Sequence, residues 1–102
     1  MAEQSPEQKV LECIDRAVGS LGESSRQVIY WHLNILYDIK RIDIPKNPQK
    51  FRECLESIFG SGASTLEVLI EMEIRSAFQI PNKAEGLEQV MKEAMGSTNE
   101  TE

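Results

Sequence analysis

The sequence lacks the features of secreted and membrane proteins. It has only two cysteines, Cys13 and Cys54, and no positively charged start followed by an apolar run and a cleavage site. We therefore expect a cytoplasmic protein with both thiols reduced. Charged residues interrupt every apolar segment before the roughly 20 residues that a membrane-spanning helix needs, so we expect no membrane association.

Residues that carry common catalytic and metal chemistry are also scarce. His32 is the only histidine, and structural zinc sites typically use four Cys or His ligands. Cys13 and Cys54 flank apolar stripes of predicted helices, where cysteines are usually inert. Residues 60–63 are glycine-rich but lack the lysine of a phosphate-binding loop and follow a helix. We expect no cofactor, no metal and no enzymatic activity.

Basic residues are fewer than acidic ones, 11 against 17, which gives a net charge of −6. A chain of this sign is repelled by phosphate backbones, so nucleic acid is an unlikely partner. Residues 40–52 depart from this balance, because they include five of the eleven basic residues. This segment is either a solvated loop or a docking patch for an acidic partner or a phosphate. Its basic residues are Lys40, Arg41, Lys46, Lys50 and Arg52.

What remains is the composition of a small globular domain. The chain has 102 residues, of which 40% are apolar, enough to build one core. We expect a single domain over residues 1–96 and a disordered acidic tail over residues 97–102. Beyond the short Ile42/Ile44 pair, no segment alternates with the period of a strand.

Capping residues and apolar periodicity predict two helices in the first part of the chain. Ser5 caps a helix over residues 6–21, which Gly22 ends. Ser24 repeats the capping pattern and opens a second helix over residues 24–39.

The remaining chain predicts three more helices. Residues 42–45 are expected to be extended, because proline disfavours helical backbone in the residue before it. A third helix then covers residues 48–59 and a fourth covers residues 64–78. Asn82 caps a weaker fifth helix that Gly96 ends. The prediction is an all-α fold, a compact four-helix core with a fifth C-terminal amphipathic helix.

The second helix is apolar around most of its circumference. A helical wheel puts a stripe with Val28 and Ile35 opposite the two tyrosines, so we expect the helix to be buried on most sides. Its aromatic residues cannot all enter one core with its aliphatic residues. Either neighbouring helices cover them, or they form a contact patch, for which a homodimer is the economical form. The aromatic residues are Tyr30, Trp31 and Tyr37.

Two polar residues lie in predicted apolar stripes, His32 on the second helix and Glu73 on the fourth. Buried polar groups need partners. We expect His32 and Glu73 to form a buried polar pair that fixes the register of the two helices. The alternatives are a proton switch, because histidine titrates near physiological pH, and a catalytic role.

Three short motifs carry a resemblance to a known family. With them, residues 21–78 resemble small archaeal all-helical domains that occur alone or as output modules of signalling proteins. The resemblance implies a role in signal transduction through protein contacts and supplies no catalytic residues. The motifs are Ile29-Tyr30-Trp31-His32-Leu33, Asp43-Ile44-Pro45 and Ile58-Phe59-Gly60-Ser61-Gly62-Ala63.

The expected function is therefore a non-enzymatic signalling or adaptor module that acts through protein contacts, as a homodimer, with a protein partner that the sequence does not name. One alternative is a small-ligand sensor with a pocket between the second and fourth helices, lined by Tyr30, His32 and Glu73. The other is a transcription regulator with helix-turn-helix-like packing, which needs a continuous basic face. The acidic balance of the chain disfavours this second alternative.

Overall fold

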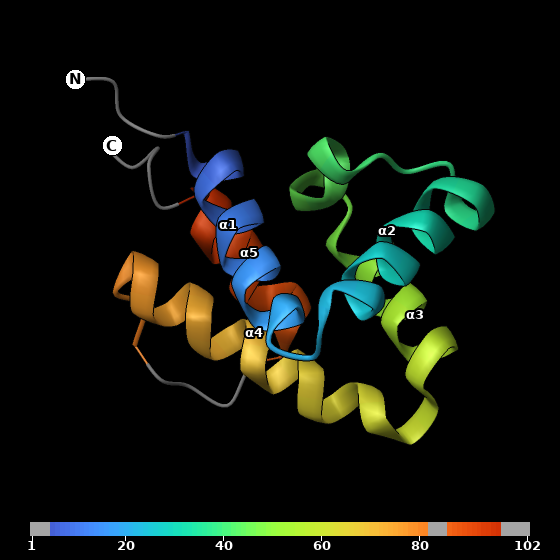
Figure 1. Ribbon diagram of the computed structural model, residues 1–102. Coiled ribbons are helices and arrows are strands. Elements are labelled where there is room, and N and C mark those ends of the chain that lie inside the picture. Colours follow the sequence, from blue (N-terminus) through green and yellow to red (C-terminus); the bar gives the residue numbers. More distant parts are fainter. Residues whose placement is uncertain (1–4, 82–85, 97–102) are drawn as a thin grey trace.

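The computed structural model describes residues 5–81 and 86–96. These residues form five α-helices, two short 3-10 helices and no strand (Figure 1). The predicted all-α fold with a fifth, C-terminal amphipathic helix is confirmed. The elements are α1 (Pro6–Gly19), α2 (Glu23–Tyr37), η1 (Arg41–Lys46), α3 (Pro48–Phe59), η2 (Gly60–Gly62), α4 (Ala63–Phe78) and α5 (Leu87–Gly96).

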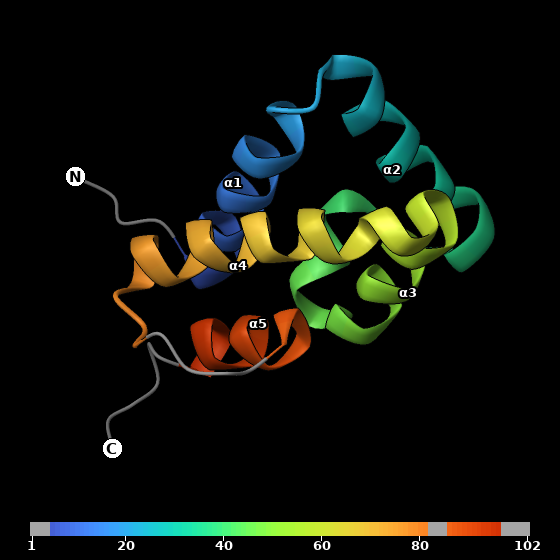
Figure 2. The same cartoon turned by 90° about the horizontal axis from the view of Figure 1, so that it is seen from below.

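The helices pack around α4, the longest of them. It contacts α1 and α5, which also contact each other, and Figure 2 shows α4 crossing this group. α3 packs against α4 and α5. α2 lies at the periphery, on α3 and the end of α1, and η1 fills the space between α1 and α2 (Figure 1). In the part of the chain that the structure describes, α2 and α4 do not contact each other.

The helices contribute very unequally to the core. α1 buries six residues and the shorter α5 buries four, whereas the 15-residue α2 buries two, Ile29 and Leu33. The helix that the sequence predicts to be buried on most sides thus buries the fewest residues of the five α-helices. The six from α1 are Val10, Leu11, Cys13, Ile14, Ala17 and Val18, and the four from α5 are Leu87, Val90, Met91 and Ala94.

The predicted helix starts hold only in part. The Ser5 hydroxyl accepts a hydrogen bond from the backbone N–H of Gln8, at 3.2 Å, as the sequence predicts. α2 begins one residue before Ser24, after Gly22 with φ of +116°, and has no side-chain cap. It ends at Tyr37, two residues before the predicted end, because Asp38 adopts the left-handed conformation.

The predicted extended segment over residues 42–45 is wrong, because it lies in the 3-10 helix η1. The backbone N–H of Asp43 donates to the Lys40 carbonyl, at 2.8 Å, and that of Asn47 donates to the Ile44 carbonyl, at 2.9 Å. The alternation of Ile42 and Ile44 reflects burial rather than a strand, since Ile44 is fully buried and Ile42 is exposed.

The turn between α3 and α4 depends on Gly60. Its φ of +58° and ψ of −130° form a conformation that L-residues with a side chain rarely adopt. α4 then begins at Ala63, one residue before the predicted start, and its N-terminus has no side-chain cap. The predicted Asn82 cap and the predicted tail, residues 97–102, lie outside the described residues.

Candidate functional site

α2 is buried on one side only. Ile29 and Leu33 are fully buried, and Tyr30 and Tyr37 pack half-buried against the core. The stripe with Val28 and Ile35 faces away from the core. The expectation that α2 is buried on most sides is therefore wrong. Residues 27–37 contain no Asp, Glu, Lys or Arg, so charge does not distinguish the two faces of this helix.

Large apolar side chains consequently line the exposed side of α2. The exposed fractions are 42% for Val28, 59% for Trp31, 57% for Ile35 and 62% for Leu36. A shallow depression runs along this side and includes Trp31 in its lining. We call this surface the outer face of α2. It consists of Ser24, Gln27, Val28, Trp31, His32, Ile35 and Leu36.

The centre of the outer face is ordered by local contacts. The rings of Trp31 and His32 pack edge to face, with centroids 5.3 Å apart and an interplanar angle of 78°. His32 also donates from Nδ1 to the Val28 carbonyl, at 3.1 Å. The indole of Trp31 thus packs against an imidazole that is itself hydrogen-bonded to the helix backbone.

The predicted buried pair of His32 and Glu73 is not formed. Both residues are half-buried, and they lie on helices that do not contact each other. Glu73 instead accepts a hydrogen bond from Arg16 of α1, with Nε–Oε1 at 2.9 Å. Tyr30, His32 and Glu73 do not converge, so the described residues do not form the pocket predicted between these helices.

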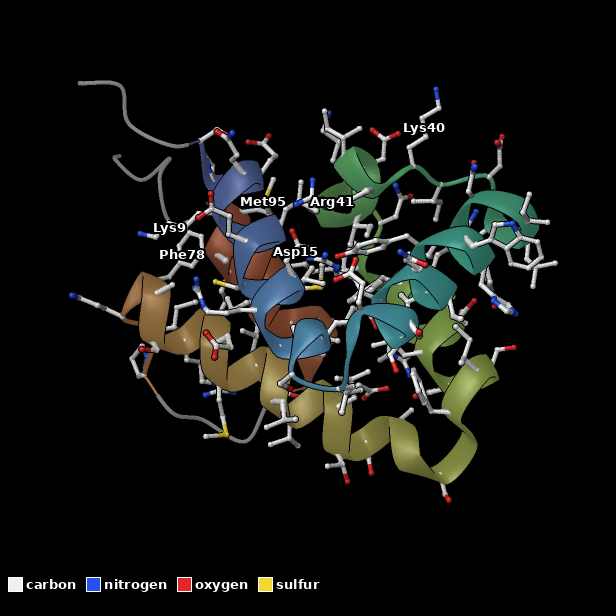
Figure 3. The ribbon with its side chains drawn as sticks, viewed as in Figure 1. Lys9, Asp15, Lys40, Arg41, Phe78 and Met95 are labelled. Carbon is white, nitrogen blue, oxygen red and sulfur yellow. The ribbon has the colours of Figure 1, made fainter. Side chains whose placement is uncertain are left out.

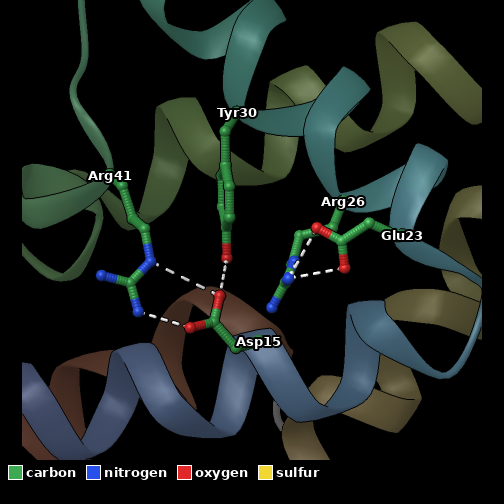
Figure 4. Close-up of polar contacts among 5 residues, drawn as sticks. All are labelled: Asp15, Glu23, Arg26, Tyr30 and Arg41. Carbon is green, nitrogen blue, oxygen red and sulfur yellow. Dashed lines mark hydrogen bonds and ion pairs between the residues drawn. The ribbon is translucent and has the colours of Figure 1, made fainter.

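A polar cluster that the sequence did not reveal joins α1, α2 and η1 (Figure 4). Asp15 of α1 accepts hydrogen bonds from the Tyr30 hydroxyl and from the Arg41 guanidinium, with Arg41 Nε–Oδ1 at 3.4 Å. The guanidinium also lies 6.0 Å from the centre of the Tyr30 ring. We call Asp15, Tyr30 and Arg41 the Asp15 cluster. It attaches the inner face of α2 to α1.

The electrostatics of the Asp15 cluster suit attachment rather than proton transfer. Partial burial opposes ionisation of Asp15, but the hydrogen bonds from Arg41 and Tyr30 outweigh it and hold the pKa of Asp15 below its usual value. Burial, with the adjacent carboxylate, raises the pKa of Tyr30. At neutral pH the carboxylate is thus a weak base and the phenol keeps its proton.

The two cysteines are buried as predicted. Burial raises the pKa of Cys54 to about 11. It also raises the pKa of Cys13, against the opposing effect of Arg16, and the Cys13 thiol donates to the Glu73 carbonyl, at 3.6 Å. Both thiols stay protonated at neutral pH, which makes them poor nucleophiles.

Within residues 5–81 and 86–96, no group of three or more His, Cys, Asp or Glu side chains could hold a metal ion. Over the same residues, no helix is both long enough and apolar enough to cross a bilayer.

The five residues of the basic segment do not act as one surface. Arg41 points toward Asp15, whereas Lys40 extends away from the molecule (Figure 3). Arg52 pairs with Glu56 of α3, at 2.9 Å, and with Glu88 of α5, at 3.4 Å. Ion pairs therefore engage both arginines. The three lysines, Lys40, Lys46 and Lys50, are exposed and Arg41 is partly so, at 44% of its side chain.

Comparison with known proteins supports the fold. No protein-family model and no curated protein match the sequence. Among solved structures, the crystal structure of PH0832 from Pyrococcus horikoshii OT3 is similar, with a TM-score of 0.81. The two sequences are 22% identical, and the match covers 93% of this chain and 98% of that chain. This likeness shows that the chain shares the fold of an archaeal protein.

Proposed function

We propose that this protein is a non-enzymatic interaction module and that the outer face of α2 is its docking surface. The observation that carries the proposal is Trp31, a tryptophan that is 59% exposed at the middle of a helix face without charged residues. Tryptophan dominates the energetics of many protein interfaces. An apolar patch of several such side chains is uncommon on a protein that works alone.

The fold supports this role because α2 is attached firmly on one side only. Ile29 and Leu33 enter the core, and Tyr30 is held by the Asp15 cluster. The opposite side remains available to a partner on a rigid element, which favours specific docking. A role as an output or adaptor module in signal transduction fits such a surface and follows the resemblance to the archaeal domains.

The two other functions receive less support. A ligand sensor would need converging polar groups, and Tyr30, His32 and Glu73 lie apart. A transcription regulator would need an unoccupied basic face, and Arg41 and Arg52 are engaged by carboxylates.

The test is capture of partners from an extract of the cells that make the protein. The tagged full chain serves as bait, beside a Trp31→Ser, Ile35→Ser variant. The matched control is Val68→Ser, Met72→Ser, because these α4 residues are 50% and 60% exposed and have similar chemistry. Circular dichroism and melting temperature establish that both variants fold.

We expect proteins that the wild type and the control retain and the α2 variant loses. Identical proteins bound by all three baits would contradict the proposal. Loss with the α4 variant alone would move the docking surface to α4.

A further inference from the structure

We infer that a second copy of this chain covers the outer face of α2, with the two α2 helices antiparallel across a twofold axis. This inference rests on the proposed function and names its partner. It follows from the distribution of charge, from the position of Trp31 and from the groups at the two ends of α2.

Charge selects the outer face of α2 for contact between two copies. Each chain carries a net charge of −6, so most of its surface repels a second copy. The outer face is an exception, because residues 27–37 form the longest run without Asp, Glu, Lys or Arg. A twofold contact presents the same patch on both sides, and a patch without charge meets its copy without repulsion.

The other exposed apolar strip is less suited to a twofold contact. It lies on α4 and contains Val68, Leu69 and Met72. Glu71 flanks it on one side of the helical wheel and Glu73 on the other. Glu71 is paired with Arg75 and Glu73 with Arg16, so two such strips facing each other would bring four ion pairs to the contact. The strip also offers no aromatic side chain.

The ends of α2 select the antiparallel arrangement. Asp38 is exposed directly after the C-terminus of α2, where a negative charge is unfavourable to its own helix dipole. An antiparallel partner places Asp38 beside the N-terminal end of the other α2, which has no side-chain cap and where Arg26 neutralises Glu23 in an ion pair at 2.6 Å. A parallel partner places it beside a second Asp38. Trp31, near the middle of Glu23–Tyr37, then lies close to the axis.

The contact is small, so the dimer is weak. A 15-residue helix face measures roughly 22 Å by 10 Å, below the about 800 Å² that each partner of a standard interface buries. We expect a dissociation constant at or above about 1 μM. Dilution and mutation should therefore move the equilibrium readily.

Sedimentation velocity over about 1 to 500 μM tests the dimer. We expect the mass to rise with concentration for the wild type and for Val68→Ser, Met72→Ser. Trp31→Ser, Ile35→Ser should weaken association at least about tenfold, as loss of a central aromatic usually does. Dimerisation unchanged in the folded α2 variant would overturn the inference.

Spin labels on a Ser24→Cys variant test the orientation, since burial protects Cys13 and Cys54 from the label. Residue 24 lies seven positions from residue 31, so its two copies in an antiparallel pair lie roughly 20 Å apart or more. In a parallel pair they lie roughly 10 Å apart, the spacing of packed helices. The short distance would overturn the antiparallel arrangement.

The inference and the proposed function fail separately. The wild type could stay monomeric over the whole concentration range and still capture other proteins through Trp31. That result would overturn the dimer but would support the outer face of α2 as a docking surface. If Trp31→Ser, Ile35→Ser changed neither the dimerisation nor the set of captured proteins, both the inference and the proposed function would be overturned.

Discussion

Asp15 and Tyr30 make the contact that orients α2, and removing the Tyr30 hydroxyl tests it. We expect Tyr30→Phe to lower the free energy of unfolding by about 1–2 kcal/mol, because the phenol donates to a carboxylate. Tyr37→Phe is the control, since Tyr37 is half-buried on the same helix and its hydroxyl has no hydrogen-bond partner within the described residues. Urea denaturation measures both, and equal losses would argue against the Asp15 cluster.

The same cluster predicts a pH dependence. The folded-state pKa of Asp15 lies below its unfolded value, which is about 3.9. The stabilisation is therefore complete above the unfolded pKa and is lost as pH falls through the folded pKa. Asp15→Asn lacks this ionisation. We expect the gap in unfolding free energy between wild type and Asp15→Asn to narrow as pH falls from about 5 toward 2. Urea titrations across that range would refute the assignment if the gap stayed constant.

At the scale of elements, α2 offers two leucines, three residues apart, that differ in burial. Leu33 is fully buried and Leu36 is 62% exposed. We expect Leu33→Ala to cost about 2–5 kcal/mol by leaving a cavity, and Leu36→Ala to cost within about 0.5 kcal/mol. Both substitutions change helix propensity equally, so thermal melts compare burial alone. Equal losses, or a larger loss for Leu36→Ala, would contradict the burial of Leu33.

The turn between α3 and α4 gives a second element-scale prediction. Gly60 has φ of +58° and ψ of −130°, a sparsely populated backbone region in which a side chain costs about 1–3 kcal/mol. We expect Gly60→Ala to destabilise the protein by about that amount. Gly19→Ala is the control, because Gly19 is helical with nothing within 4 Å of an added Cβ. It should stabilise the protein by up to about 1 kcal/mol, and chemical denaturation separates the two cases.

The sequence predicts most of these elements because charge marks their outer faces. α1 and α3 alternate apolar and charged residues at helical spacing, and their bounds agree with prediction to within two residues. α2 lacks these markers over residues 27–37, so a wheel shows two apolar faces and cannot choose between them. Which of the two faces is buried depends on contacts between residues that are far apart in the sequence, such as Tyr30 and Asp15. For the same reason the predicted pair of His32 and Glu73 is wrong: a helical wheel shows neither which face of α2 is buried nor which helix it packs against.

At the scale of the whole molecule, the uneven core explains the candidate function. α1, α4 and α5 bury one another, and α3 packs against α4 and α5. α2 is then left with one side on its own chain and one side exposed. Its charge-free outer face stands out on a protein of net charge −6, which is the pattern expected of a surface that must approach a like-charged copy.

Acrylamide quenching of Trp31 fluorescence tests this account most directly, because Trp31 is the only tryptophan in the chain. With the outer face exposed in a single chain and covered in a pair, quenching should be strong at about 1 μM and should weaken as concentration rises. The change should disappear in Ile35→Ser, which keeps the fluorophore but weakens the contact. Quenching of the wild type that does not vary with concentration, whether strong or weak, would contradict the account.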